Sequence, residues 1–123
     1  MKINLIKIFP GDYSNLDAYN RITDYILQKP YVGGYGFTLP LTKSTVIKQL
    51  EASNLASTYN GDRFVWHFII SIPRIKKHST LLLLAEKIAT LFTRDYQILY
   101  ALDLDPGHYH LHFAINAYSY HPN

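Results

Sequence analysis

The sequence contains no cysteine, which excludes a disulfide framework and thiolate ligands for a metal. Any metal site must therefore use histidine and carboxylate ligands. Long hydrophobic runs are also absent, and the longest, residues 81–85, is far too short to cross a bilayer. Residues 1–7 lack the extended apolar stretch and the small-residue cleavage site of a secretion signal, so we expect a cytoplasmic protein with no membrane association.

The chain also lacks internal repeats, a linker rich in proline or serine, and any shift in composition along its 123 residues. We therefore expect one domain, residues 1–123, with one hydrophobic core. A hydrophobic content of 48% excludes intrinsic disorder, and a formal net charge of +3 favours an anionic partner. Two common motifs are missing: there is no Gly-x-Ser-x-Gly turn, and the glycine-rich stretch 33–36 lacks the Lys-Ser/Thr of a nucleotide-binding loop.

The spacing of apolar residues predicts strands over 3–9, 63–72, 96–102 and 108–116, of which the last two form a hairpin. Helices are expected to begin at Ser14 or Asn15, near Thr42, and at Ser79-Thr80, the last extending through Phe92. Residues 33–36 are expected to form a flexible loop. This order of elements implies an α+β fold, a mainly antiparallel sheet with helices packed on one of its faces.

Histidines occupy every second position at the start of the predicted strand 108–116. His108, His110 and His112 fall on one face together with Asn116, while the opposite face is apolar. Two imidazoles separated by one residue can converge on a single metal ion. The alternative is a polar strand face exposed to solvent, and residue chemistry alone leaves both interpretations open.

Three segments resemble the motifs of a known family. Residues 96–102, an acidic turn and the segment from His110-Leu111-His112 to Asn116 look like the third motif of the plasmid-mobilisation relaxases of the MobA/VirD2-like group. These relaxases are HUH endonucleases, which nick DNA at a transfer origin. Residues 65–71 resemble the family's central strand, and residues 22–27, which include Tyr25, resemble its first motif. The resemblance covers most of the chain in the family's order and implies the HUH fold shared with rolling-circle replication proteins.

The resemblance further implies a metal-dependent DNA strand transfer. His110 and His112 would hold a divalent ion, Mg²⁺ or Mn²⁺, that polarises the scissile phosphate. Tyr25 would attack the phosphorus and give a 5′-phosphotyrosyl DNA and a free 3′-hydroxyl. The substrate would be single-stranded or hairpin DNA at a transfer origin, and accessory mobilisation proteins are candidate partners.

Tyr19 is the main rival nucleophile among the 11 tyrosines. It falls on the apolar stripe of its predicted helix and is expected to be buried, whereas Tyr25 falls off the centre of that stripe, where its hydroxyl could reach the metal face. Further residues are expected to contact DNA through phosphates and base stacking, against the alternative that they are ordinary surface or core residues. They are Arg21, Lys29, Arg63, His67 and Asn116.

One position departs from the family pattern. Relaxases usually have a third histidine seven residues before the His-x-His pair, and this sequence has Asp103 there. A hairpin loop over residues 104–107 would place Asp103 opposite His108 and on the histidine face. A carboxylate at that point completes a site of two histidines and one carboxylate; alternatively, His108 takes the third position and Asp103 caps the turn.

Three functions stay open at this stage. The first is a metal-dependent, tyrosine-using DNA strand transferase that acts in plasmid or transposon mobilisation. The second is a catalytically weak or inactive relaxase-like module, short or truncated, that binds DNA as an accessory factor. The third is a metal-binding structural domain outside the family.

Overall fold

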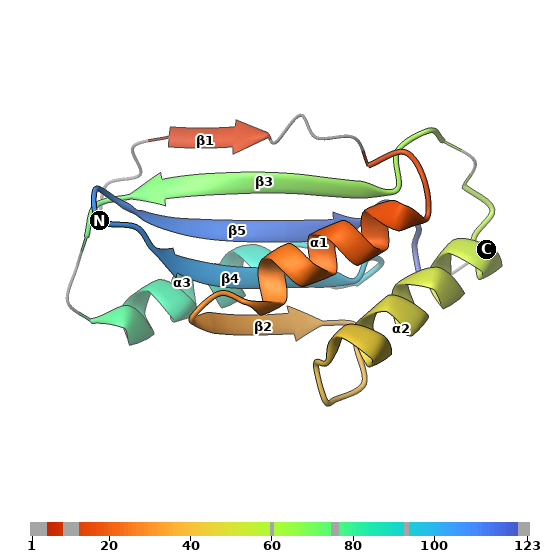
Figure 1. Ribbon diagram of the computed structural model, residues 1–123, viewed down its shortest axis with the longest axis horizontal. Helices are drawn as coiled ribbons and strands as arrows, with labels where there is room; N and C mark the ends of the chain where they lie inside the picture. Colours follow the sequence, from red (N-terminus) through yellow and green to blue (C-terminus); the bar gives the residue numbers. More distant parts are fainter. Residues whose placement is uncertain (1–4, 9–12, 60, 75–76, 93, 121–123) are drawn as a thin grey trace.

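A computed structural model describes residues 5–8, 13–59, 61–74, 77–92 and 94–120 of the chain (Figure 1). Helices and strands alternate along most of the sequence and end in a hairpin. The elements are β1 (Leu5–Ile8), α1 (Asp17–Leu27), β2 (Tyr31–Tyr35), α2 (Lys43–Ala56), β3 (Val65–Ile72), α3 (His78–Ala89), β4 (Ile98–Leu104) and β5 (Tyr109–Asn116).

The five strands form one antiparallel sheet in the order β1-β3-β5-β4-β2, with β5 in the centre (Figure 1). An α+β fold built on an antiparallel sheet is therefore confirmed. The histidine strand is buried between two neighbours, β3 and β4, rather than at an edge. Side chains from three adjacent strands can consequently face one point above the sheet.

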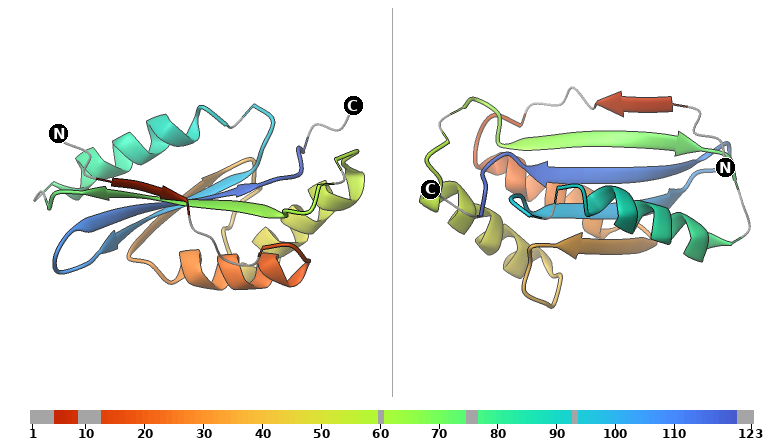
Figure 2. Two further views of the ribbon diagram at one scale, coloured as in Figure 1. Left: turned by 90° about the horizontal axis from the view of Figure 1, so that it is seen from above. Right: turned by 180° about the vertical axis from the view of Figure 1, so that it is seen from behind.

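Helices cover both faces of the sheet, so the expectation that they share one face is wrong. Helices α1 and α2 lie on one side and α3 on the other (Figure 2). Each side has its own hydrophobic cluster: Tyr19, Ile22, Val46 and Leu50 pack over Leu99 on the α1–α2 side, and Leu81 and Ala85 of α3 pack over Leu111 and Phe113 on the other. The apolar face of β5 is therefore filled by α3, and its histidine face is turned toward α1.

The sequence predicted the start of one helix correctly and the starts of the other two incorrectly. Helix α2 begins near Thr42 as expected, and Thr42 caps it: its hydroxyl accepts a hydrogen bond from the Thr45 backbone N–H, and the Thr45 hydroxyl accepts one from the Thr42 backbone N–H. The expected caps at Ser14 or Asn15 are wrong, because α1 begins after Leu16 without a side-chain cap. Helix α3 likewise begins after Lys77 and ends at Ala89, short of the predicted Phe92.

Strand β2 occupies residues that were expected to form a flexible loop. Gly33 and Gly34 pair with Tyr100 and Leu99 of β4 and close the sheet on that edge. The glycine at position 33 has a packing role, since a Cβ there would lie 2.3 Å from the ring of Tyr100. Among the glycines that the structure describes, Gly36 alone has a positive φ, and it directly follows the last residue of the strand.

The β4–β5 hairpin has a different register from the predicted one. Its loop comprises residues 105–108, so Leu104 pairs with Tyr109 and Asp103 pairs with His110. The predicted pairing of Asp103 with His108 is wrong by two residues. A shift of two preserves the face of every side chain, and Asp103 therefore still lies on the histidine face.

Candidate active site

The β4–β5 hairpin and helix α1 meet at a cluster of titratable side chains. Asp103, His110 and His112 lie on the face of the hairpin that α1 covers. Helix α1 contributes Tyr25, whose ring centroid lies 5.3 Å from that of His112 and 5.7 Å from that of His67. Together they border a cavity of about 350 Å³, which is lined by Tyr25, Ile69, Ser71, Asp103, Asp105, His110 and His112.

His67 and His112 are both buried and lie side by side. Nε2 of His67 is 3.2 Å from Nδ1 of His112, and the hydroxyl of Tyr13 is 3.1 Å from Nδ1 of His67. Burial, reinforced by neighbouring positive charges, lowers the pKa of each imidazole to about 4. Both rings are therefore neutral at pH 7. Nε2 of His112 is buried and has no hydrogen-bond partner in the described part of the chain. The distance from this nitrogen to Oδ2 of Asp103 is 3.8 Å.

His110 is oriented by Asp105, which the sequence indicated only as a turn residue. Nδ1 of His110 pairs with Oδ2 of Asp105 across the hairpin loop. Because Nδ1 is engaged, Nε2 is the ring nitrogen left to coordinate a ligand. The signal that could have identified Asp105 is its spacing, two residues beyond Asp103 in the acidic turn before the histidines.

Lys29, just beyond the end of α1, places a positive charge between Tyr25 and Asp103. Its Nζ lies 3.0 Å from Oδ2 of Asp103 and 4.1 Å from the centroid of the Tyr25 ring. Burial alone would lower the pKa of Lys29, but the hydrogen bond to Asp103 and the charges of Tyr25 and Asp103 raise it above its usual value. Lys29 is therefore protonated at neutral pH and lies within reach of both side chains.

Tyr19 and Asn116 form a separate buried network. The Tyr19 hydroxyl donates to Oδ1 of Asn116 over 2.8 Å, and Nδ2 of Asn116 donates to Gln97 and to the carbonyl of Leu50. Burial raises the pKa of Tyr19 to about 12. The predicted burial of Tyr19 is confirmed, whereas Tyr25 is half-buried at the edge of the cavity.

The remaining candidates do not line this cavity. His108 is exposed and lies in the hairpin loop, one residue before β5 begins, so it is not part of the strand that carries His110 and His112. Arg21 forms an exposed ion pair with Asp17, and the guanidinium of Arg63 lies 4.6 Å from the ring centroid of Trp66. Asn116 and His67 are buried and engaged in hydrogen bonds within the protein.

The family model described as "Relaxase: MobA/VirD2-like, nuclease domain" matches residues 25–122, which is most of the chain and begins at Tyr25. The chain belongs to this relaxase family. No curated protein and no solved structure matches it. Relaxases nick DNA, and that general activity is the function of the family to which these residues belong. No helix that the structure describes combines the length and the apolar character needed to cross a membrane.

The divalent metal on which relaxases generally depend fits the donor chemistry of this cavity. Neutral His112 has an unsatisfied buried nitrogen, Asp105 orients His110, and Asp103 supplies a carboxylate, which is the mixed set that Mn²⁺ or Mg²⁺ accepts. The described residues hold no group of three or more such side chains already gathered around one point. The ammonium of Lys29 lies 3.0 Å from Oδ2 of Asp103, so a metal ion would share this carboxylate with the lysine or compete with the lysine for it.

Proposed function

We propose that this relaxase nicks single-stranded DNA at a transfer origin by transesterification, with Tyr25 as the nucleophile, in plasmid or transposon mobilisation. The position of Tyr25 supports this most directly. The centroid of its ring lies 5.3 Å from that of His112, and both residues line the same cavity. The rival Tyr19 is buried and its hydroxyl is bound to Asn116. A phenol that already donates to a buried amide is poorly placed to attack a phosphate.

His110, His112 and Asp103 are the proposed ligands, and a divalent ion held by them would neutralise charge on the scissile phosphate. Tyr25 attacks the phosphorus, the bond to the 3′ oxygen breaks, and the leaving oxygen takes up a proton. When the Tyr25 hydroxyl loses its proton, the phenol oxygen becomes negatively charged. Lys29, which stays protonated, stabilises that charge. The products are a 5′-phosphotyrosyl DNA and a free 3′-hydroxyl. Because the phosphodiester energy is conserved in the new bond, the 3′-hydroxyl can reverse the reaction.

The test is covalent capture with a pool of single-stranded oligonucleotides of random sequence, in the presence of Mn²⁺. We expect a denaturation-resistant adduct whose DNA-linked peptide, identified by mass spectrometry, contains Tyr25. Tyr25→Phe should abolish the adduct, and Tyr19→Phe should keep it because Tyr19 is only structural here. An adduct that persists in Tyr25→Phe and disappears in Tyr19→Phe would overturn the proposal.

One observation favours a second candidate, a relaxase-like module that binds DNA as an accessory factor with little nicking activity. Lys29 pairs with Asp103 at the position where relaxases usually carry a third histidine, and the pair neutralises a carboxylate that a metal would need. In that case the same oligonucleotide pool would be retained on the protein without forming any adduct, with Mn²⁺ or without it. A denaturing gel that detects the covalent adduct, run beside a native gel that detects retained DNA, therefore distinguishes the two candidate functions.

A further inference from the structure

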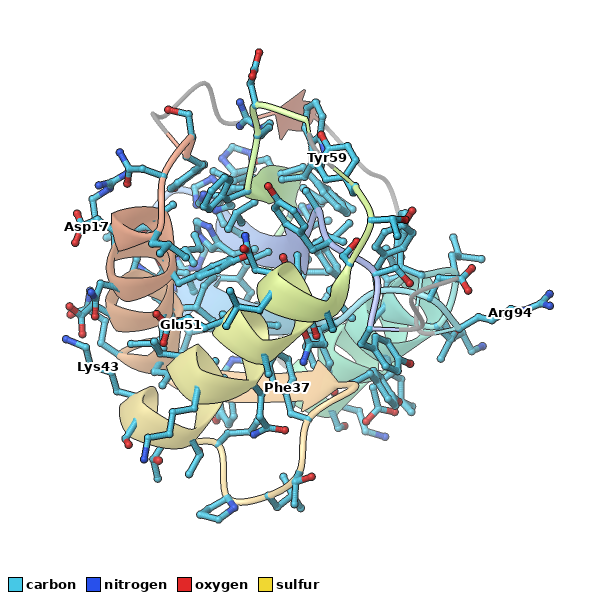
Figure 3. The ribbon with its side chains drawn as sticks, turned by 90° about the vertical axis from the view of Figure 1, so that its right-hand side faces the viewer. Asp17, Phe37, Lys43, Glu51, Tyr59 and Arg94 are labelled. Atoms are coloured by element: carbon cyan, nitrogen blue, oxygen red, sulfur yellow. The ribbon has the colours of Figure 1, made fainter. Side chains whose placement is uncertain are left out.

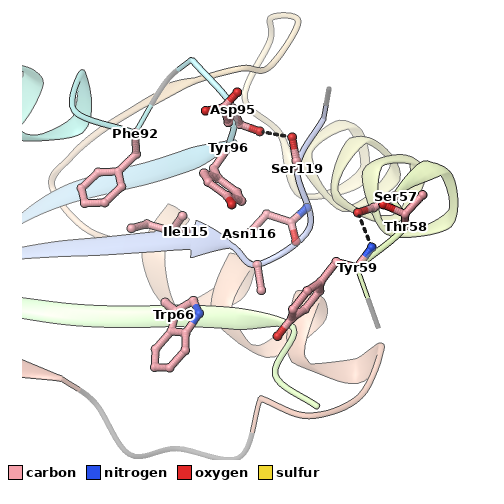
Figure 4. A pocket seen from close by; sticks show the side chains of 11 residues that line it. Ser57, Thr58, Tyr59, Trp66, Phe92, Asp95, Tyr96, Ile115, Asn116 and Ser119 are labelled. Carbon is pink, nitrogen blue, oxygen red and sulfur yellow. Dashed lines mark hydrogen bonds between the residues drawn. The ribbon is translucent and has the colours of Figure 1, made fainter. Parts of the chain in front are cut away.

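A second, larger cavity lies beyond the catalytic side chains, where β5 ends and β3 begins. Its volume is about 800 Å³, within the range of small-molecule binding pockets (Figure 4). Trp66 and Ile115 form its floor on the α3 side of the sheet, opposite to the face that carries His112. Tyr59 and Tyr96 border it from two connecting segments. No group invoked in the proposed reaction lines this cavity.

Three aromatic side chains remain exposed around this cavity. Trp66, Tyr59 and Tyr96 keep 45%, 42% and 37% of their surface accessible, and they come from a strand and two separate loops. Figure 4 shows their rings around one hollow rather than packed on each other. Large exposed aromatics gathered in one pocket bury further apolar surface when a ligand enters it, and flat rings offer faces on which a planar ligand can stack.

Polar groups accompany the aromatic rings. Asp95 and Ser119 lie on one wall, where the Ser119 hydroxyl donates to the Asp95 carbonyl over 2.8 Å, and Ser57 lies on another (Figure 4). The carboxylate of Asp95 can accept hydrogen bonds from the amino groups of a nucleobase. The same carboxylate repels a phosphate, so a nucleotide would enter with its base inward and its phosphate outward.

Positive charge is available outside the cavity for that phosphate. The guanidinium of Arg63 lies 4.6 Å from the ring centroid of Trp66, and the side chain of Arg94 extends into solvent (Figure 3). Arg63 is also 5.7 Å from the ring centroid of Tyr13, whose hydroxyl contacts His67. A chain of contacts therefore runs from the aromatic pocket around β3 to the histidines.

We propose that the pocket of Trp66, Tyr59 and Tyr96 binds unpaired bases of the single-stranded DNA substrate, with Arg63 on the adjoining phosphate. This inference rests on the proposed function, because it assigns a second contact to the same substrate. Aromatic platforms beside basic side chains bind single strands with little sequence preference, since every base has a flat face. A duplex hides those faces, so the pocket selects single-stranded over double-stranded DNA.

The chain offers a direct probe, because Trp66 is its only tryptophan. Tyr25→Phe protein, which cannot form the proposed adduct, is titrated with fluorescently labelled random single strands, while Trp66 emission and label anisotropy are followed. We expect the strand to quench Trp66 and the matching duplex to bind more weakly. Tyr96→Ala should weaken binding about tenfold, the loss that corresponds to about 1.4 kcal/mol of stacking. Tyr31→Ala is the matched control, because Tyr31 is 39% exposed but lies on β2 outside the pocket.

The possible outcomes separate the two proposals. Binding by anisotropy with unchanged Trp66 emission, and equal affinities for the Tyr96 and Tyr31 variants, would overturn the pocket and leave the Tyr25 reaction standing. Quenching and a weaker Tyr96→Ala complex, in a chain that forms no Tyr25 adduct, would support the pocket and overturn the reaction. Absence of any binding to single strands would overturn both.

Discussion

The hydroxyl of Tyr19 donates a 2.8 Å hydrogen bond to the side-chain oxygen of Asn116, which lies 97 residues later in the chain. The amide of Asn116 in turn donates to the carbonyl of Leu50 and to the side chain of Gln97. One buried amide thus connects α1, α2 and the beginning of β4 to the end of β5. The polar face of the histidine strand thus carries the proposed metal ligands His110 and His112 at one end and the buried hydrogen-bond network of Asn116 at the other.

Tyr19→Phe should reduce stability in a way that depends on pH. At pH 8 we expect the free energy of unfolding to fall by about 1 kcal/mol, because a buried hydrogen bond is lost. The pKa of Tyr19 is about 12 in the folded chain and about 10 when unfolded, so the neutral phenol's contribution is complete below pH 10 and is lost as pH rises toward 12. Urea unfolding at a series of pH values from 8 to 11 should therefore show that the difference in the free energy of unfolding between wild type and variant becomes smaller as the pH rises. A gap that stays constant would contradict the assigned role.

The sequence predicted the strands whose residues are large and apolar, and it missed the strand built on glycine. Strand β3 contains tryptophan, phenylalanine and isoleucine in alternation, and it lies where the pattern placed it. Strand β2 contains Gly33 and Gly34, which have no intrinsic strand preference. Their conformation is imposed by β4, where the Tyr100 ring fills the space that a side chain at position 33 would need. That contact is tertiary and leaves no local pattern.

Gly33→Ala should therefore destabilise the fold. The added methyl would lie 2.3 Å from Tyr100, whose ring is almost fully buried and must move. We expect a loss of about 1–3 kcal/mol in the free energy of unfolding, measured by urea titration. Gly107→Ala is the control, because a Cβ there meets no atom within 4 Å. Equal stability of the two variants would show that the Tyr100 contact does not explain the glycine.

The sequence predicted which residues of the candidate site share a face of the sheet, but it did not predict the contacts that their side chains make. The face shared by His110, His112 and Asp103 follows from alternation along strands, which survives an error of two residues in the hairpin. The pairing of His110 with Asp105 and of Lys29 with Asp103 depends on loop length and on where α1 ends. Neither is encoded in a short repeating pattern, so both became visible only in three dimensions.

The proposed third metal ligand can be tested by comparing Asp103→Ala with His108→Ala. Asp103 pairs with His110 and has a carboxylate oxygen 3.8 Å from Nε2 of His112, whereas His108 is exposed in the loop. We expect calorimetric titration with Mn²⁺ to show at least about tenfold weaker binding for Asp103→Ala and unchanged binding for His108→Ala. A loss confined to the His108 variant would show that the carboxylate assignment is wrong.

Lys29 should act against metal binding, because its ammonium and a divalent ion compete for the same carboxylate. Nζ of Lys29 lies 3.0 Å from Oδ2 of Asp103, and both side chains are largely buried. Lys29→Met keeps the length and packing of the side chain while it removes the charge and frees Asp103. We therefore expect Mn²⁺ to bind about tenfold more tightly to Lys29→Met than to wild type, a difference on the order of 1 kcal/mol for an ion pair that is partly screened.

Lys29→Arg is the matched control, since it retains the positive charge beside Asp103 and should leave the Mn²⁺ affinity near that of wild type. In the double variant Lys29→Met, Asp103→Ala the gain should vanish, because the freed carboxylate is what strengthens binding. Weaker Mn²⁺ binding in Lys29→Met would mean that the lysine helps to assemble the site rather than to block it. If the double variant still binds Mn²⁺ more tightly than wild type, Lys29 opposes the metal through a ligand other than Asp103. His112 is then the first candidate, because the charge of Lys29 helps to lower the pKa of the His112 imidazole.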